Sequence, residues 1–258
     1  MTSPFGHTRN VVKERYALLT PNGHVAAPLP GWTKAACVVL ISPGMGARFS
    51  QMLITFADGG RGSGDTGHTE MFAYVLDGSC ELKVSKRHKL TAGSYAYLPP
   101  GQRFEFKKPA PGTRILLFQK TFEPLAKTPR PTIVISHADE KPGVPFLGDP
   151  DARLQTLLPD SPTFDMAVNI FTYQPGATLP FVETHIMEHG LLMLSGQGVY
   201  RLDADWHPVM AGDVIWMAPY CPQWFVAMGK SPASYIYYKD VNRPALEERE
   251  TQDVKRKT

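Results

Sequence analysis

Short apolar runs separated by glycine turns occur twice along the chain, with nearly the same spacing each time. Gly78 and Gly93 in the first copy are 15 residues apart, and Gly196 and Gly212 in the second are 16 apart. Each copy reads as an apolar strand, a Gly turn, a second strand, an Ala-Gly turn and a strand that ends at proline. Short strands at this spacing are typical of antiparallel sandwiches and barrels, so we expect an all-β chain with two barrels in tandem. The matching segments are 70–78 with 92–101 and 188–196 with 211–219.

The two copies are about 118 residues apart, so each accounts for one domain of ordinary size. Residues 127–162 between them contain seven prolines and little periodicity, which favours a connection. We predict few helices, with one short candidate at 150–158, and a strand and turn at 16–24. The predicted divisions are an N-terminal arm (1–30), an N-terminal barrel (31–126), a connecting segment (127–163), a C-terminal barrel (164–243) and a polar tail (244–258).

Composition is typical of a folded chain and argues against nucleic-acid and membrane partners. Of 258 residues, 43% are hydrophobic and 20% are charged, which is enough apolar material for a sizeable core. The net charge is only +3, and the basic residues form no stripe apart from the short run 255–257, so we expect no nucleic-acid partner. The longest apolar runs, such as 35–41, are too short to span a bilayer, so we expect no membrane association.

The cysteines and the first residues favour a reducing, cytoplasmic location. Cys37, Cys80 and Cys221 are an odd number without a Cys-x-x-Cys spacing, which argues against a disulfide framework or a structural zinc site. Cysteines kept as thiols are usual in reducing compartments. The first ten residues contain no apolar stretch of the kind found in secretory signals.

Candidate chemistry is concentrated in one short segment of the second unit. Of eight histidines only His185 and His189 lie close together, in the run 180–190, which also contains Glu183. On a strand, residues two apart point to the same side, so Glu183 and His185 are expected to share a face. A tight hairpin across 186–188 would return His189 on the next strand. One carboxylate and two imidazoles would then converge, which is a suitable ligand set for a divalent metal.

Two other interpretations of this segment stay open. Residues 185–189 match H-x-x-E-H, an inverted form of the zinc-protease motif, which requires a helix so that both histidines share one face. The segment runs from a proline through β-branched residues to Gly190, which disfavours a helix. The other interpretation is a pair of structural histidines satisfied by hydrogen bonds, and the repeat context disfavours it.

The two units resemble the two characteristic motifs of the cupin superfamily. The first cupin motif consists of Gly, five residues, His-x-His, three or four residues, Glu, six residues and Gly. The second unit keeps this spacing, but the ligand order changes to Glu183, His185 and His189. The second cupin motif normally ends in a histidine ligand, and eleven residues after the Ala-Gly turn the chain has Gln223, an uncharged candidate ligand. The resemblance implies a bicupin, with two tandem jelly-roll barrels of the double-stranded β-helix type.

The first unit lacks this ligand set. His68 and Glu70 remain there, but they are out of register with it. Apolar side chains do not replace ligands for Mn²⁺ or Fe²⁺, so we expect an N-terminal barrel without metal ligands. With the Gly turns aligned, the residues opposite His185, His189 and Gln223 are Gly67, Met71 and Phe104.

From about residue 12 to 243, longer stretches resemble one family within the superfamily, the (S)-ureidoglycine aminohydrolases. The matching stretches are 16–23, 183–190, 194–202 and 235–243. The resemblance implies Mn²⁺-dependent hydrolysis of (S)-ureidoglycine to (S)-ureidoglycolate and ammonia in purine (allantoin) catabolism. It implies Glu183, His185, His189 and Gln223 as metal ligands. It also implies Tyr200, Tyr235 and Lys239 as substrate contacts, with Glu183, Tyr200 and Lys239 as catalytic groups.

Residue chemistry is consistent with the substrate contacts. The substrate carries a carboxylate, and Lys239 ends an alternating aromatic strand on which Tyr235 and Tyr237 share its face. Phenolic hydroxyls at Tyr200 and Tyr235 can donate to carboxylate or ureido oxygens. Each residue also has an ordinary interpretation, as a barrel-wall tyrosine, a strand-packing tyrosine and a solvated lysine. The general base stays open between a side chain near the metal and Lys239 in its neutral form.

Two other functions compete with this one. A metal-dependent cupin dioxygenase uses a similar pocket, and a non-catalytic bicupin binds a small acid without turnover. Spacing does not separate Mn²⁺ from Fe²⁺, Ni²⁺ or Zn²⁺, since one N/O site binds all of them. We expect a small-molecule substrate and a homo-oligomer, to which residues 9–30 can contribute a contact.

Overall fold

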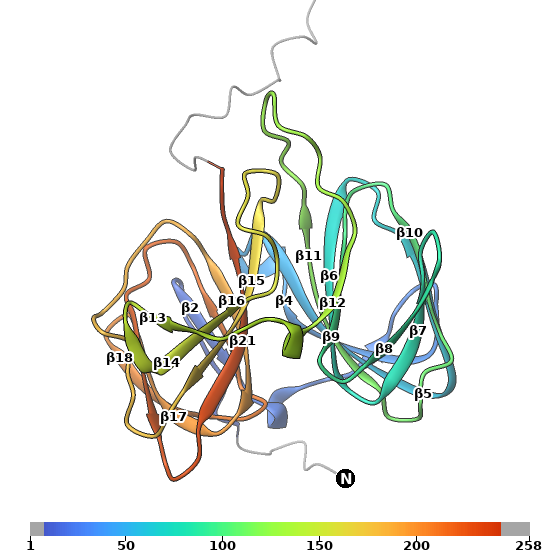
Figure 1. The fold of residues 1–258 in the computed structure, drawn as a ribbon. Coiled ribbons are helices and arrows are strands. Elements are labelled where there is room, and N and C mark those ends of the chain that lie inside the picture. Colours follow the sequence, from blue (N-terminus) through green and yellow to red (C-terminus); the bar gives the residue numbers. More distant parts are fainter. Residues whose placement is uncertain (1–7, 244–258) are drawn as a thin grey trace, which may run out of the picture.

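The structure of the chain, a computed structural model, describes residues 8–243 as two β-barrels side by side (Figure 1). One ten-stranded sheet curls into the N-terminal barrel, and an eight-stranded sheet packs with a three-stranded sheet to form the C-terminal barrel. The prediction of an all-β chain with two tandem barrels is confirmed. The described residues contain no α-helix, only three short 3₁₀ turns at Pro21–Gly23, Pro43–Met45 and Ala138–Glu140.

All strand pairings in these sheets are antiparallel. The ten-stranded sheet contains β3 (Ala27–Pro28), β4 (Trp32–Ile41), β5 (Phe49–Asp65), β6 (Thr69–Asp77), β7 (Ser79–Lys83), β8 (Arg87–Thr91), β9 (Ser94–Leu98), β10 (Arg103–Lys107), β11 (Arg114–Thr121) and β12 (Val134–His137). The eight-stranded sheet contains β1 (Val11–Val12), β2 (Tyr16–Leu19), β13 (Val144–Phe146), β14 (Asp149–Thr156), β15 (Met166–Tyr173), β16 (His189–Ser195), β19 (Val214–Met217) and β21 (Ala233–Asp240). The three-stranded sheet contains β17 (Gln197–Leu202), β18 (Asp205–Met210) and β20 (Gln223–Met228).

Segments outside the two predicted barrels supply strands to both. β2, from the predicted arm, pairs with β19 and places Leu18 opposite Ile215, so this blue strand lies within the C-terminal barrel in Figure 1. From the predicted connecting segment, β12 pairs with β9 of the N-terminal barrel, and β13 and β14 extend the C-terminal sheet. The predicted polar tail, with its basic run, lies outside the described residues.

The short helix expected at 150–158 is wrong, because this segment forms β14. It pairs with β15 from Ala152 opposite Tyr173 to Thr156 opposite Asn169. A helix this short is marginal on its own in water. As a strand, the segment instead satisfies its backbone on both neighbours and buries Ala152 in the barrel core. Here tertiary pairing decides the local conformation.

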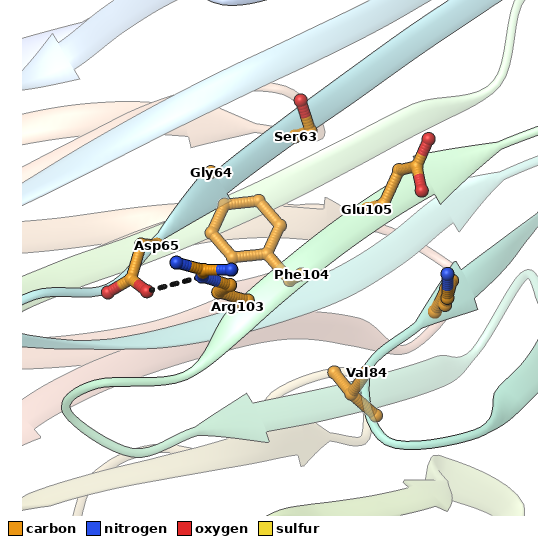
Figure 2. A pocket seen from close by; sticks show the side chains of 8 residues that line it. Ser63, Gly64, Asp65, Val84, Arg103, Phe104 and Glu105 are labelled. Atoms are coloured by element: carbon orange, nitrogen blue, oxygen red, sulfur yellow. Dashed lines mark ion pairs between the residues drawn. The ribbon is translucent and has the colours of Figure 1, made fainter.

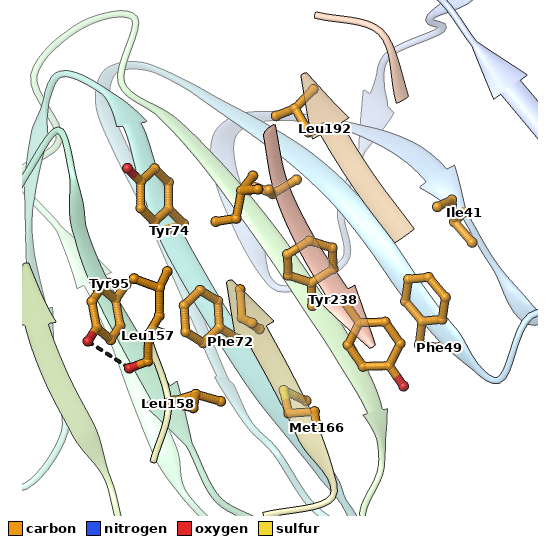
Figure 3. Packing of buried hydrophobic residues seen from close by; sticks show 14 of the residues in the cluster. Ile41, Phe49, Phe72, Tyr74, Tyr95, Leu157, Leu158, Met166, Leu192 and Tyr238 are labelled. Atoms are coloured by element: carbon orange, nitrogen blue, oxygen red, sulfur yellow. Dashed lines mark hydrogen bonds between the residues drawn. The ribbon is translucent and has the colours of Figure 1, made fainter. Parts of the chain in front are cut away.

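Side-chain alternation divides the buried core into three parts. On β21, Tyr235 and Tyr237 face the core of the C-terminal barrel, whereas Ile236 and Tyr238 join a cluster between the two barrels. In that cluster the rings of Tyr238 and Phe49 stack with centroids 4.2 Å apart (Figure 3). Burying one such side chain stabilises the fold by about 1.5–3 kcal/mol. The interface therefore holds the barrels together as a hydrophobic core in its own right.

Two further observations bear on the expectations from sequence. Cys37, Cys80 and Cys221 are buried free thiols. Between residues 8 and 243, no helix is long and apolar enough to cross a membrane.

Candidate metal and substrate site

The two neighbouring histidines meet inside the C-terminal barrel. His189 is the first residue of β16 and is 7% exposed, and His185 lies on the loop before it. Their Nε2 atoms are 3.0 Å apart. The expected hairpin across 186–188 is wrong, because residues 184–188 form neither strand nor helix, and Glu183 makes only an isolated bridge to Gln223. The absence of a helix there also removes the H-x-x-E-H interpretation.

One hydrogen bond fixes the tautomer of His185. Its Nδ1 lies 3.0 Å from the backbone oxygen of Met187, and a carbonyl oxygen only accepts, so Nδ1 carries the proton. The Nε2 atom of the neutral ring then has a free lone pair, which faces His189 and Gln223. Metal-ligating histidines are arranged in this way, with one nitrogen bonded to a backbone carbonyl and the other free.

Gln223 completes a group of three side chains. Its amide nitrogen is 3.1 Å from His185 Nε2, and its Oε1 accepts from the Tyr200 hydroxyl at 3.1 Å. Two backbone hydrogen bonds, of 2.8 and 2.9 Å, fix Gln223 against Glu183. A hydroxyl accepts as well as donates, so turning the amide over presents its oxygen to the histidines and keeps the bond to Tyr200.

Burial keeps both imidazoles uncharged. Desolvation lowers the pKa of His189 well below its usual range, and the neighbouring His185 and Lys239 lower it further. Desolvation also lowers the pKa of His185, although the Met187 carbonyl opposes the shift. Uncharged imidazoles are the form that binds a metal ion.

Glu183 lines the same small cavity as His189 and Gln223, with a volume of about 30 Å³. A volume of this size accommodates an ion or roughly one to two water molecules. Burial raises the pKa of Glu183, and the charge of Lys239 opposes that shift. Within the described part of the chain, no three His, Cys, Asp or Glu side chains converge closely enough to form a metal site. The close group is therefore two imidazoles and an amide, with the Glu183 carboxylate beside the cavity.

This set of donors fits a divalent cation. The free lone pair at His185 Nε2 lies within 3.1 Å of both His189 Nε2 and the Gln223 amide, in a partly buried position. Imidazole nitrogen, amide oxygen and carboxylate oxygen together suit Mn²⁺, Fe²⁺ and similar ions. A divalent cation bound to this uncharged cluster would be the largest charge in the site.

Tyrosines form much of the cavity wall. Tyr200 and Tyr235 are almost fully buried and line it together with Tyr237. Burial raises the pKa of both Tyr200 and Tyr235 well above the usual range, so they are uncharged hydrogen-bond donors. The hydroxyl of Tyr235 is 3.1 Å from that of Tyr173, and the Asn169 amide donates to Tyr237 at 3.1 Å. Sequence reasoning did not select Tyr173 or Asn169, because only the pairing of β15 with β21 brings them here.

Lys239 lies directly opposite His189 where β16 pairs with β21. Alternation along β21 places it on the same side as Tyr235 and Tyr237. Its positive charge acts to lower the pKa of His185, of His189 and of Glu183 alike. A cation therefore stands beside the cavity, where it can attract an anionic group.

The N-terminal barrel has apolar side chains at the equivalent positions. Met71, opposite His189 in the repeat, is buried in that barrel's core. The preceding Glu70 faces the other barrel, and Asp165 of that barrel raises its pKa. Phe104 lines an open depression of about 520 Å³ beside the ion pair of Arg103 with Asp65, whose closest atoms are 3.7 Å apart (Figure 2).

Two family models match the chain, one in each barrel. Residues 169–238 match the model described as cupin domain, and residues 46–113 match the one described as EutQ-like cupin domain. The two barrels and the two matches together define the class of protein, a bicupin of the cupin superfamily.

Similar proteins of known name indicate the family within this superfamily. The (S)-ureidoglycine aminohydrolase of Escherichia coli is 38% identical over 91% of this chain and 92% of its own length. That of Arabidopsis thaliana is also 38% identical, over 93% of this chain and 80% of its own length. The chain therefore belongs to the (S)-ureidoglycine aminohydrolase family, and the resemblance seen in the sequence is confirmed.

Solved structures share this architecture. The E. coli protein Ylba superposes with a TM-score of 0.82 at 34% identity, covering 92% of this chain and 95% of that one. A protein of Pseudomonas aeruginosa described as a putative glyoxylate induced protein gives 0.84 at 29%, covering 93% of each chain. Oxalate decarboxylase of Bacillus subtilis gives 0.68 at 12%, over 88% of this chain and 77% of its own, which shows a shared fold alone.

Proposed function

We propose that this chain is a metal-dependent (S)-ureidoglycine aminohydrolase that releases ammonia and (S)-ureidoglycolate in purine (allantoin) catabolism. The carbon–nitrogen bond at the chiral carbon breaks, a bond from that carbon to water oxygen forms, and the amine leaves as ammonia. The support from sequence is 38% identity to relatives of that name over almost the whole chain. The observation that carries the proposal is the meeting of His185, His189 and Gln223 beside one small cavity, which His189 and Gln223 line.

The proposed metal is Mn²⁺, and its proposed ligands are Glu183, His185, His189 and Gln223. When bound, a divalent ion supplies positive charge and open positions that anchor the substrate and orient it for replacement of its amine. The fixed tautomer of His185 and the uncharged state of both imidazoles support this assignment. The N-terminal barrel is proposed to hold no metal.

The substrate contacts follow from charge and hydrogen-bonding capacity. Lys239 is the cation for the substrate carboxylate, because its charge acts across the whole donor cluster. Tyr200 and Tyr235 donate hydrogen bonds to carboxylate or ureido oxygens, since burial keeps both hydroxyls protonated. The apolar wall of Leu179 and Leu191 excludes bulk water, which strengthens each of these interactions.

Substrate entry requires the site to open. The cavity of about 30 Å³ holds roughly one to two water-sized groups, fewer than the atoms of ureidoglycine. The segment 174–188 carries Glu183 and His185, contains no strand, and exposes Phe181 and Val182. We therefore propose that this loop moves outward to admit the substrate.

Ammonia release from freshly generated ureidoglycine tests the reaction directly. The purified chain is assayed with and without added Mn²⁺, and its metal content is measured by plasma mass spectrometry. One metal per chain with Mn²⁺-dependent ammonia release is the expected result. Bound metal with no ammonia but with oxygen uptake would overturn the proposal in favour of a dioxygenase, and bound substrate with neither would leave a binding protein.

Further proposals rest on the sequence. They are a small-molecule substrate as the main partner, a homo-oligomeric assembly and a cytoplasmic location. The predicted domain divisions are retained as proposals, with β2 and β14 in the C-terminal sheet and β12 in the N-terminal one.

A further inference from the structure

Arg48 of the N-terminal barrel reaches across to the C-terminal barrel. Its guanidinium is 2.6 Å from Asp240 Oδ2 and 3.7 Å from Glu188 Oε1. Its backbone N–H donates to Glu188 Oε1 at 2.7 Å, and the backbone N–H of Glu188 donates to Asp240 Oδ1 at 2.6 Å. We call these three residues the Arg48 clasp. Each of them is tied to the other two.

The Arg48 clasp holds the immediate neighbours of two proposed site residues. Glu188 directly precedes His189, and Asp240 directly follows Lys239. His189 and Lys239 face each other where β16 pairs with β21. Because side chains alternate, these two face the cavity while their neighbours face Arg48. One guanidinium from the other barrel therefore fixes the backbone beside both the imidazole and the ammonium.

The first residues of β5 also lie against the strand that carries His189. A Cβ atom on Gly190 would come within 2.4 Å of the Phe49 ring. The amide of Gln51 donates to the backbone oxygen of Leu191 at 3.4 Å. Residues 48–51 thus run along residues 188–191. The N-terminal barrel is the outer support of the backbone on which His189 sits.

A second clasp of the same composition provides an internal comparison. In the repeat Glu70 corresponds to Glu188, and Asp165 of the other barrel, which pairs with Lys120 at 2.6 Å, acts on its charge. This Lys120 clasp also joins two carboxyl groups and one cation across the interface. The residue after Glu70 is Met71, which offers no ligand for Mn²⁺. None of the three residues of the Lys120 clasp is a sequence neighbour of a proposed site residue.

We propose that Arg48 is a positioning residue through which the N-terminal barrel sets the places of His189 and Lys239. The inference rests on the proposed metal and substrate site. Without the guanidinium, the carboxyl groups of Glu188 and Asp240 lose their shared cation, and Glu188 is fully buried. The start of β16 and the end of β21 then lose the guanidinium that links both of them to the N-terminal barrel, and the imidazole and ammonium shift with them.

The test compares R48M with R48K and with K120M, all in the full chain. K120M removes the cation from the Lys120 clasp and is the matched control. The first readout is the imidazole ¹⁵N spectrum of the metal-free protein, labelled at histidine and assigned with H185A and H189A. The second is Mn²⁺ affinity, measured from the electron paramagnetic resonance signal of free Mn²⁺. The third is KM against kcat for ammonia release.

R48M is expected to shift the His185 and His189 resonances and to weaken Mn²⁺ binding roughly tenfold, as loss of an outer partner of a metal ligand does. It should also raise KM, because Lys239 moves, and R48K should recover part of each effect. K120M should lower the melting temperature but leave the two histidine resonances in place. Unchanged resonances in R48M, or equal shifts in K120M, would overturn the inference.

The readouts separate this inference from the proposed function. If the wild-type chain binds no Mn²⁺, the proposed metal site fails, and the metal-free imidazole spectra still decide whether Arg48 positions His189. If R48M does not fold, D240N replaces it, since it removes one charge from the Arg48 clasp and keeps the side-chain shape. D240N should shift the same two resonances in the same direction. Wild-type resonances in D240N count against the inference.

Discussion

At the scale of single residues, His189 is the side chain on which the proposed metal site depends most. It is buried at the start of β16, and its Nε2 is 3.0 Å from that of His185. H189A should lower metal content and ammonia release by more than about 100-fold, beyond the 10–100-fold typical of an outer partner of a ligand. Plasma mass spectrometry and the ammonia assay measure both. H68A, at an exposed histidine, is the control and should match wild type.

Replacement of Lys239 should weaken substrate binding and leave metal binding unchanged. Loss of a charge-assisted hydrogen bond costs about 1.5–3 kcal/mol, so K239M should raise KM by roughly 10–100-fold. Metal content should stay at the wild-type level, because no proposed ligand is removed. Steady-state kinetics on metal-loaded protein give the first quantity. Unchanged kinetics would rule out the assigned role in binding the substrate carboxylate.

Sequence reasoning reached those site residues that lie in one repeat unit. Spacing selected Glu183, His185, His189 and Gln223. The structure places Glu183, His189 and Gln223 on one cavity, with His185 Nε2 within 3.1 Å of the last two. Spacing did not select Asn169 or Arg48, which reach the site region from other segments. Asn169 lies on β15, and Arg48 comes from the other barrel. Asn169 arrives through the pairing of β15 with β21, and Arg48 arrives through an ion pair between the barrels, and no local pattern encodes either contact.

At the scale of elements, the packing of β5 against β16 leaves no room beside Gly190. A methyl group there would meet the Phe49 ring at 2.4 Å and the Gln51 amide oxygen at 2.7 Å. G190A should therefore lower the free energy of unfolding by about 1–3 kcal/mol, as overpacking does. Urea denaturation measures the change. G44A, where an added Cβ has only an ordinary contact, is the matched control, and equal losses in both would contradict the packing argument.

The strands that were predictable are those with an apolar run bounded by glycine turns. β6 and β9 in one barrel and β16 and β19 in the other follow the repeat. The prediction of a helix at β14 was wrong because the residues of this segment are compatible with a helix, and nothing in their pattern indicates the pairing with β15. The loop at 184–188 was mistaken for a hairpin because Glu183 pairs with β20, some forty residues later, and not with the strand that follows it.

At the scale of the whole molecule, buried charge between the barrels makes stability depend on pH. Burial first, and then Asp165, raise the pKa of Glu70 well above its ordinary value of 4.5, while Tyr97 and Lys120 oppose the shift. Above pH 4.5 the unfolded chain has released a proton that the folded chain still holds. This contribution to stability is therefore lost as pH rises from about 4.5 toward the folded pKa.

E70Q should remove that part of the pH dependence. The amide keeps an acceptor for the Tyr97 hydroxyl, and it does not titrate. Between pH 5 and pH 8 the variant should lose less stability than the wild-type chain, as measured by urea unfolding at several pH values. E14Q, at an exposed position, is the control. Identical slopes for E70Q and wild type would show that Glu70 is ionised in the folded state.

The two faces of β21 predict that the effects of mutation alternate along this strand. Tyr235 and Tyr237 face the cavity, and Ile236 and Tyr238 face the other barrel. In a scan of substitutions along this strand, the main effect should alternate between loss of activity and loss of folded protein from one residue to the next. Conservative changes at Tyr235 and Tyr237, such as tyrosine to phenylalanine, should leave abundant protein with low activity, whereas polar changes at Ile236 and Tyr238 should leave little protein. Loss of activity and loss of protein would then mark alternate residues of one strand. Both can be measured in cells without purifying a variant.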